Sequence, residues 1–141
     1  MDAASVLTVI PCLDEADHIA PLIACLLRDP ANRRIVVADG GSTDGTRAIV
    51  KAIAAGEPRV VLLDNPDRIQ SAGVNRAVAR FGSEATWLAR VDAHALYPED
   101  YVSRLLATAG AQHVDAVVVG MVTEAPRGIA GPFARGVAAA Q

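Results

Sequence analysis

The chain is poor in aromatic residues, and this shortage narrows its fold class. Phe, Trp and Tyr make up 4% of the 141 residues, whereas 52% of the residues are hydrophobic. The apolar content therefore comes from aliphatic residues, with alanine and valine abundant, which suit parallel strands buried on both faces by helices. At this length we expect one domain with a sizeable core.

Other shortages bear on partners and compartment. The formal net charge of −3 gives no electrostatic reason to expect nucleic-acid binding. Lys51 is the only lysine, so the basic residues are nearly all arginines, whose forked guanidinium favours anion recognition. The spacing of Cys12 and Cys25 fits neither a metal site nor a redox pair, so we expect reduced thiols in the cytoplasm.

The sequence also lacks a secretory signal and an apolar run long enough to cross a bilayer. We therefore expect a cytoplasmic chain. Any contact with a membrane, at its inner face, would be made by segments outside these 141 residues.

What is present is a regular alternation of strand and helix patterns. Strands are expected where short aliphatic runs are bounded by turn residues, and helices where apolar residues recur at three- and four-residue spacing. The expected strands are 6–10, 34–38, 59–63, 86–91 and 116–122, and the expected helices are 15–28, 46–55, 71–81 and 98–109. The boundary residues expected from their chemistry are Pro11 after the first strand, Asp14 as cap of the first helix, and Gly56, Gly82 and Gly110 after the later helices.

This alternation predicts an α/β fold with a doubly wound, mostly parallel sheet and helices on both faces. With the strands in the order 3-2-1-4, ligands bind beyond the carboxyl ends of the strands, near the point where the order reverses. Three polar or acidic loops converge there: 11–15 after the first strand, Asp39 after the second, and 92–94 after the fourth. Their convergence indicates a ligand site.

The most specific segment is Val36-Val37-Ala38-Asp39-Gly40-Gly41-Ser42-Thr43-Asp44-Gly45-Thr46, which follows an apolar strand pattern. Position 42 is serine where a dinucleotide-binding loop needs glycine, and no Gly-Lys-Ser/Thr follows as in a P-loop. What remains is an acidic strand end, where Asp39 can accept hydrogen bonds from a base or a ribose. The alternative is structural, with Asp44 or Ser42 capping the next helix and the glycines serving the turn.

Asp92 and His94 are two residues apart, so in extended backbone their side chains point to the same side and can bind one divalent cation. This donor pair suits Mn, Fe, Co or Zn, and Mg if a diphosphate supplies further oxygens. The alternative is a cap and a surface histidine. Arg68 and Arg90 are candidates to neutralise phosphate, or equally ion-pair partners for Asp67 or another carboxylate.

Together these segments resemble a family 2 glycosyltransferase with a GT-A fold, and the chain is similar to the bacterial exopolysaccharide enzymes of the succinoglycan type. The resemblance covers essentially all of the sequence. It is carried by Ile10 to Glu15, Val37 to Thr46, Asn65 to Asn75, and Arg90 to His94 with Pro98 four residues on.

The resemblance implies that 1–141 is the nucleotide-sugar-binding part of a glycosyltransferase domain that continues beyond Gln141. Asp39 is implied to accept from a uracil-type N3–H, and Asp92 and His94 stand where the family carries Asp-x-Asp, which implies a Mn or Mg ion bridging the diphosphate. The implied nucleotide-binding residues are Pro11, Leu13, Glu15, Asp39, Gly41, Ser42, Arg68 and Asp92.

Three positions depart from the family pattern. Asp14 replaces the usual Asn, Ile69 and Val74 replace a Gly and an Arg, and His94 replaces the second Asp. The last change bears on which metal is bound, because imidazole is itself a competent ligand.

The implied reaction is the inverting transfer of a sugar from a nucleoside diphosphate sugar, a UDP-sugar in the first place, to a saccharide or lipid-linked acceptor in exopolysaccharide synthesis. Its carboxylate base is expected beyond Gln141, so we expect this chain to bind nucleotide without transferring sugar, and to self-associate through uncovered apolar surface. Two alternatives are a nucleotide-sugar-binding module without turnover and a nucleotidyltransferase. The latter would be expected to carry a Gly-rich basic loop in place of 11–15.

Overall fold

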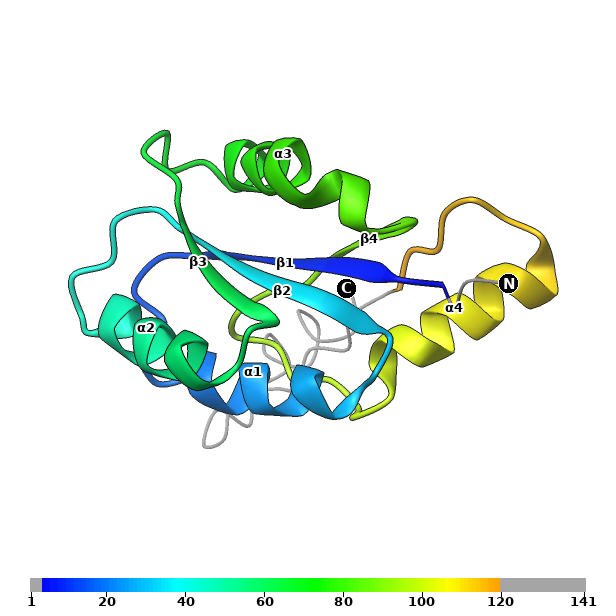
Figure 1. Ribbon diagram of the computed structural model, residues 1–141, viewed down its shortest axis with the longest axis horizontal. Coiled ribbons are helices and arrows are strands. Elements are labelled where there is room, and N and C mark those ends of the chain that lie inside the picture. The colour runs from blue at the N-terminus through cyan, green and yellow to red at the C-terminus, as the bar shows by residue number, and fades with distance from the viewer. Residues whose placement is uncertain (1–3, 120–141) are drawn as a thin grey trace, which may run out of the picture. The chain divides into compact units, whose positions relative to one another are not determined.

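The computed structural model describes residues 4–119 (Figure 1). The chain divides into two compact units at Thr108 and Ala109, and the sheet and the candidate site belong to the first unit. The strands are β1 (Val6–Cys12), β2 (Asn32–Asp39), β3 (Val60–Asp64) and β4 (Trp87–Arg90). The helices are α1 (Ile19–Arg28), α2 (Thr46–Gly56), α3 (Gln70–Phe81) and α4 (Tyr101–Gln112), with a 3-10 turn at Gly82–Glu84.

The four strands form one parallel sheet in the order β3-β2-β1-β4, which confirms the predicted order and fold class. Helices α1 and α2 cover one face of the sheet and α3 covers the other (Figure 1). Each strand-to-helix crossover brings the next strand back in the same direction, so the carboxyl ends of all four strands meet at one edge.

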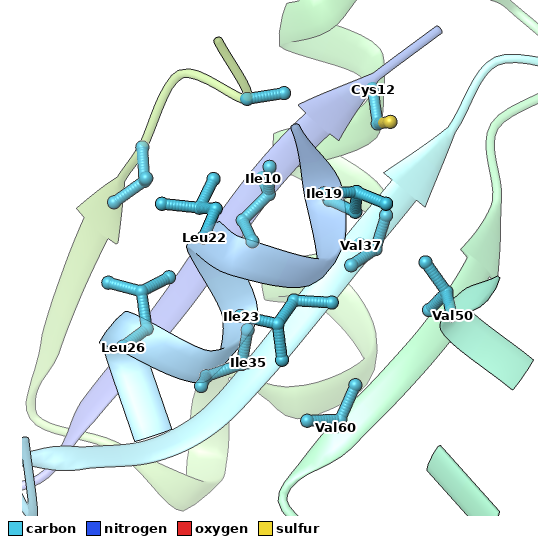
Figure 2. Packing of buried hydrophobic residues seen from close by; sticks show 12 residues of the cluster. Ile10, Cys12, Ile19, Leu22, Ile23, Leu26, Ile35, Val37, Val50 and Val60 are labelled. Carbon is cyan, nitrogen blue, oxygen red and sulfur yellow. The ribbon is translucent and has the colours of Figure 1, made fainter. Parts of the chain in front are cut away.

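The core is aliphatic on both faces because β1 and β2 alternate their side chains between two layers of helix. Ile35 and Val37 of β2 pack toward α1 and α2, while Val36 and Ala38 pack toward α3. Figure 2 shows the first of these layers. Burying each such Val, Leu or Ile contributes about 1.5–3 kcal/mol, which is why the strand pattern could be recognised without aromatic residues.

β1 continues through Pro11 to Cys12, so the prediction that Pro11 ends this strand is wrong. Pro11 pairs with Ala38 of β2. The carbonyl of Val9 accepts from Val91 on the β4 side, and Pro11, two residues later, has its nitrogen on that same side. Pairing with β4 ends at Val9, so the missing proline N–H breaks no ladder bond.

α1 begins at Ile19 rather than at position 15, and its N-cap is His18, so Asp14 is not the cap. Asp14 has a φ of 52° and its carboxylate accepts from the Thr43 amide, which commits it to a contact between loops. At the start of α2 the N-cap is Gly45 rather than Asp44 or Ser42, although Asp44 Oδ1 accepts from the Thr46 amide at 3.0 Å.

Later boundaries agree only in part. α2 ends at Gly56 and α3 ends at Phe81 just before Gly82, as predicted. Gly110 lies inside α4, so the prediction that it ends the helix is wrong; one glycine costs a helix only about 1 kcal/mol. Within the predicted strand 116–122, residues 116–119 form no strand and 120–122 lie outside the described residues. Between residues 4 and 119, no helix is long and apolar enough to cross a membrane.

Candidate functional site

A cavity of about 200 Å³ lies at the carboxyl ends of the strands. Its lining comes from the segments that follow β1, β3 and β4 and from the end of β2, so the predicted convergence of loops is confirmed. The lining residues are Pro11, Cys12, Leu13, Glu15, Ala38, Asn65, Arg68, Gln70, Asp92, Ala93 and His94.

Most of the predicted site residues lie in this wall. Pro11, Leu13, Glu15, Arg68, Asp92 and His94 line the cavity. Asp39, Gly41 and Ser42 are not among its lining residues, and they form the turn between β2 and α2 instead. The structure also brings in Asn65 and Gln70, which lie in the loop after β3 and at the start of α3.

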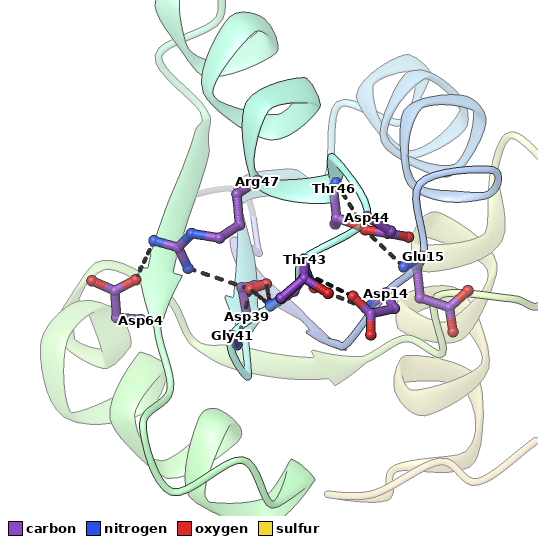
Figure 3. Close-up of polar contacts among 10 residues, drawn as sticks. Asp14, Glu15, Asp39, Gly41, Thr43, Asp44, Thr46, Arg47 and Asp64 are labelled. Atoms are coloured by element: carbon purple, nitrogen blue, oxygen red, sulfur yellow. Dashed lines mark hydrogen bonds and ion pairs between the residues drawn. The ribbon is translucent and has the colours of Figure 1, made fainter.

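The loops after β1 and β2 are joined by reciprocal hydrogen bonds (Figure 3). The Asp14 amide donates to Ser42 Oγ at 2.8 Å, and Asp14 Oδ1 accepts from the Thr43 amide at 2.8 Å. The Glu15 amide donates to Thr46 Oγ1 at 3.0 Å. These bonds fix the backbone that carries Leu13 and Glu15 into the cavity.

The Asp39 carboxylate holds the turn after β2. Its side chain is fully buried, and Oδ1 accepts from the Gly41 amide at 3.1 Å and from the Ser42 amide at 2.9 Å. Arg47 of α2 donates to the same oxygen at 3.3 Å and to Asp64 Oδ1 at 2.6 Å (Figure 3). The structural role proposed for this segment is therefore present, and recognition of a base by Asp39 stays a prediction.

Two buried groups near the cavity have shifted pKa values. Burial by itself raises the pKa of Asp39, but hydrogen bonds from Ser42, Gly41 and Arg47 more than offset it, so the pKa is lowered and the group is ionised at neutral pH. Burial, with a further contribution from Asp39, raises the pKa of Cys12 to about 12. Cys12 therefore contributes a neutral thiol to the cavity wall rather than a nucleophile.

The loop after β4 is closed by a tyrosine that sequence reasoning did not single out. The Asp92 amide donates to the Tyr97 hydroxyl at 2.9 Å, and the Tyr97 ring lies 4.6 Å from that of Tyr101. Burial raises the pKa of Tyr97, so its hydroxyl stays neutral at physiological pH. The contact spans five residues of irregular loop, and no periodic pattern in the sequence indicates it.

Asp92 and His94 have only weak protein partners. Asp92 Oδ1 lies 3.4 Å from Arg90 Nη2, and His94 Nδ1 lies 3.5 Å from Glu15 Oε1, while Glu15 Oε2 contacts His18 Nδ1 at 2.9 Å. No cluster of three or more His, Cys, Asp or Glu side chains within residues 4–119 is arranged to hold a metal ion. A cation held by Asp92 and His94 would thus need further oxygens from a bound molecule.

The two candidate arginines differ in position. Arg68 lines the cavity and has a left-handed φ of 64°. Arg90 does not line it and instead contacts Gln70 and Asp92, which is the ion-pair role that the sequence left open. Arg68 is therefore the arginine placed to meet an anion in the cavity.

Comparison with known proteins gives the family. Residues 8–128 match the family model described as "Glycosyl transferase family 2". The chain belongs to glycosyltransferase family 2. This membership favours a glycosyltransferase over the nucleotidyltransferase alternative.

A curated relative of this family 2 chain is the succinoglycan biosynthesis protein ExoA of Rhizobium meliloti (strain 1021). The two are 54% identical over 125 residues, which are 87% of this chain and 38% of that protein. The chain thus spans 38% of the length of the relative that it matches.

Two solved structures share the fold. The mannosyltransferase PcManGT from Pyrobaculum calidifontis, in complex with GDP-Man and Mn²⁺, is 26% identical with a TM-score of 0.61, over 83% of this chain and 34% of that one. TarS 1–349 of S. aureus, in complex with UDP, is 17% identical with a TM-score of 0.60, over 84% of this chain and 38% of that one. The parallel sheet of this chain is thus a GT-A fold.

Proposed function

We propose that this chain is the donor-binding part of an inverting glycosyltransferase that takes a sugar from a nucleoside diphosphate sugar, with a UDP-sugar as the expected donor. The acceptor is a saccharide or a lipid-linked saccharide in exopolysaccharide synthesis. The observation that carries the proposal is the cavity at the carboxyl ends of the strands, where Arg68, Asp92 and His94 meet. Support comes from the relative named for succinoglycan biosynthesis and from the UDP and GDP-Man complexes of the similar structures.

The cavity wall offers a surface for each part of the donor. Pro11 and Leu13 supply apolar surface for a base, and the Glu15 carboxylate supplies an acceptor for ribose hydroxyls. Arg68 supplies a guanidinium for the negatively charged diphosphate.

A divalent cation, Mn or Mg, fits the donor pair at the end of β4. Asp92 and His94 would hold it, and a carboxylate beside an imidazole suits Mn. When bound, the cation supplies positive charge that stabilises the departing diphosphate. Tyr97 holds the backbone of Asp92 and so keeps this carboxylate at the cavity wall.

The base that deprotonates the acceptor is proposed to lie in the part of the protein that follows this chain. We also propose that the whole protein acts in the cytoplasm at the inner face of the membrane, with membrane contact made by other segments.

The proposal predicts that Mn tightens nucleotide binding through His94. Titration calorimetry of the full chain should show UDP binding that strengthens when Mn is added, because two protein ligands alone hold the cation weakly. His94→Ala should flatten this rise. His113→Asn, which changes a histidine outside the cavity lining, should leave it intact.

Two results would contradict the proposal at different levels. If UDP fails to bind with or without Mn, the donor site is wrong. If UDP binds and His94→Ala responds to Mn as the unaltered chain does, only the role of His94 as a metal ligand is wrong.

A further inference from the structure

Asn65, which follows β3 directly, has one side-chain atom without a partner. The residue is 3% exposed and lies in the cavity wall. Its Nδ2 donates to the Ile69 carbonyl at 2.9 Å, and its backbone carbonyl accepts from the Arg68 amide at 3.0 Å. Within residues 4–119, Asn65 Oδ1 is the only buried side-chain oxygen or nitrogen that has no hydrogen-bond partner.

The surroundings keep this oxygen where it is. Exchanging Oδ1 and Nδ2 would set two acceptors against each other at the Ile69 carbonyl, so the amide orientation follows from its contacts. A Cβ at Gly73 would lie 3.0 Å from Asn65 Nδ2 and 3.0 Å from the Ala38 Cβ, so α3 leaves the side chain little room to turn. A buried acceptor held without a donor is costly, and such groups in native structures call for an explanation.

The same loop holds Arg68 in a backbone conformation that arginine seldom adopts. Its φ is 64°, and the two Asn65 bonds, to the Arg68 amide and the Ile69 carbonyl, lie on either side of it. Backbone outliers persist where the surrounding structure over-determines them, and they concentrate at ligand sites. The strained residue and the unpartnered oxygen both lie in the cavity wall.

We propose that Asn65 determines specificity for the base of the donor nucleotide, with Oδ1 accepting a hydrogen bond from the imide N–H of a uracil-type base. This inference rests on the proposed function. Asp92 follows β4 at one edge of the sheet and Asn65 follows β3 at the other, so a diphosphate beside Asp92 leaves the base toward Asn65. Asp39, the other candidate acceptor, is buried and already accepts from Gly41, Ser42 and Arg47.

The test compares UDP with 3-methyl-UDP, in which a methyl group replaces the imide hydrogen. On the full chain, calorimetry should show UDP binding about tenfold more tightly, the loss expected when a buried acceptor is denied its donor. In Asn65→Ala the affinity ratio should fall to about one. The ratio is the readout because a loop that is merely loosened would weaken both ligands alike.

Asn32→Ala is the matched control. Asn32 is equally buried, but its Oδ1 accepts from Thr8 and its Nδ2 donates to the Leu26 carbonyl, away from the cavity lining. This variant should lose thermal stability and keep the tenfold ratio. Asn65→Asp, which retains an acceptor and loses the Nδ2 donor, should likewise be less stable and still discriminate.

The outcomes separate the two proposals. Equal affinity of the unaltered chain for UDP and 3-methyl-UDP overturns the role of Asn65 without the need for any variant. A ratio that survives in Asn65→Ala overturns it too, and assigns the imide hydrogen to another acceptor such as Asp39. If the unaltered chain binds no nucleotide at all, the proposed function falls and this inference falls with it.

Discussion

The carboxylate of Asp39 closes the turn between β2 and α2 by accepting from two backbone amides and from Arg47. That an acid stands at this strand end is evident from the sequence. Its partners are not, because Asp39 is aligned with Arg47 and Asp64 only when α2 packs beside β3. The same carboxylate was predicted to recognise a base, and its burial now ties that hypothesis to the integrity of the turn.

Asp39→Asn should therefore destabilise the chain in a pH-dependent way. The folded-state pKa of Asp39 lies below its ordinary value of 3.8, so its contribution is present above that pH and is lost as the pH falls through the lower folded-state value. At pH 7 the variant should lose about 1.5–3 kcal/mol of unfolding free energy, the range for hydrogen bonds to a charged group. Urea denaturation at pH 7 and near pH 3 measures the difference.

Asp17→Asn is the control, because Asp17 is exposed and should be neutral at both pH values. A deficit in Asp39→Asn that stays the same at low pH would show that the ionised carboxylate is not what holds the turn.

Among the elements, the first turn of α4 is tied to the end of α1 by a distant side chain. Asp29 is 3% exposed, and its Oδ2 accepts from the Ser103 amide at 2.8 Å while its Oδ1 accepts from the Ser103 hydroxyl and the Ala31 amide. A carboxylate at a helix N-terminus satisfies a free amide and faces the positive end of the helix dipole. The loop that carries Asp92 and His94 is thus anchored at both ends, by β4 and by Asp29.

Asp29→Ala should lower the free energy of unfolding by about 2 kcal/mol, the upper value for loss of a helix cap. Removing a surface carboxylate, in Asp67→Ala, should cost less than about 1 kcal/mol, because Asp67 and its partner Arg76 are both exposed. Urea denaturation of the two variants gives the comparison. Similar losses in both would mean that Asp29 does not anchor α4.

For the whole molecule, the sheet builds a donor cavity, but the chain spans 38% of the relative that it matches. Of the carboxylates in the cavity wall, Glu15 contacts His18 and His94, and Asp92 is the proposed metal ligand. Leu88 on the edge strand β4 is 47% exposed and Leu96 is 98% exposed, and both belong to the apolar surface through which we expect self-association.

The 141-residue chain should bind nucleotide but not transfer sugar, because the proposed base lies outside it. The measurement is transfer of a radiolabelled sugar from its nucleotide to a saccharide or lipid-linked acceptor, run beside a protein extended to the length of the relative. Only the longer protein should turn over. Comparable transfer by both would place the base within the residues of this chain.

Most of the fold was determined by the sequence alone, because alternation in β2 and helical spacing in α1 to α3 are local properties that read out burial directly. The strand order and the convergence of the loops at 11–15, 39 and 92–94 followed from the handedness of the crossovers. Local signals failed where a boundary depended on a neighbour, as at Pro11, or on helix tolerance, as at Gly110.

Only the tertiary structure decided which polar groups meet. Tyr97 under Asp92, Arg47 on Asp39 and the unpartnered oxygen of Asn65 all depend on side chains brought together from different strand ends or across irregular loops. Hydrogen bonds are short-ranged and directional, so their partners are set by the packed positions of the elements. Residue types and periodicity could therefore predict the location of the site, but not its internal contacts.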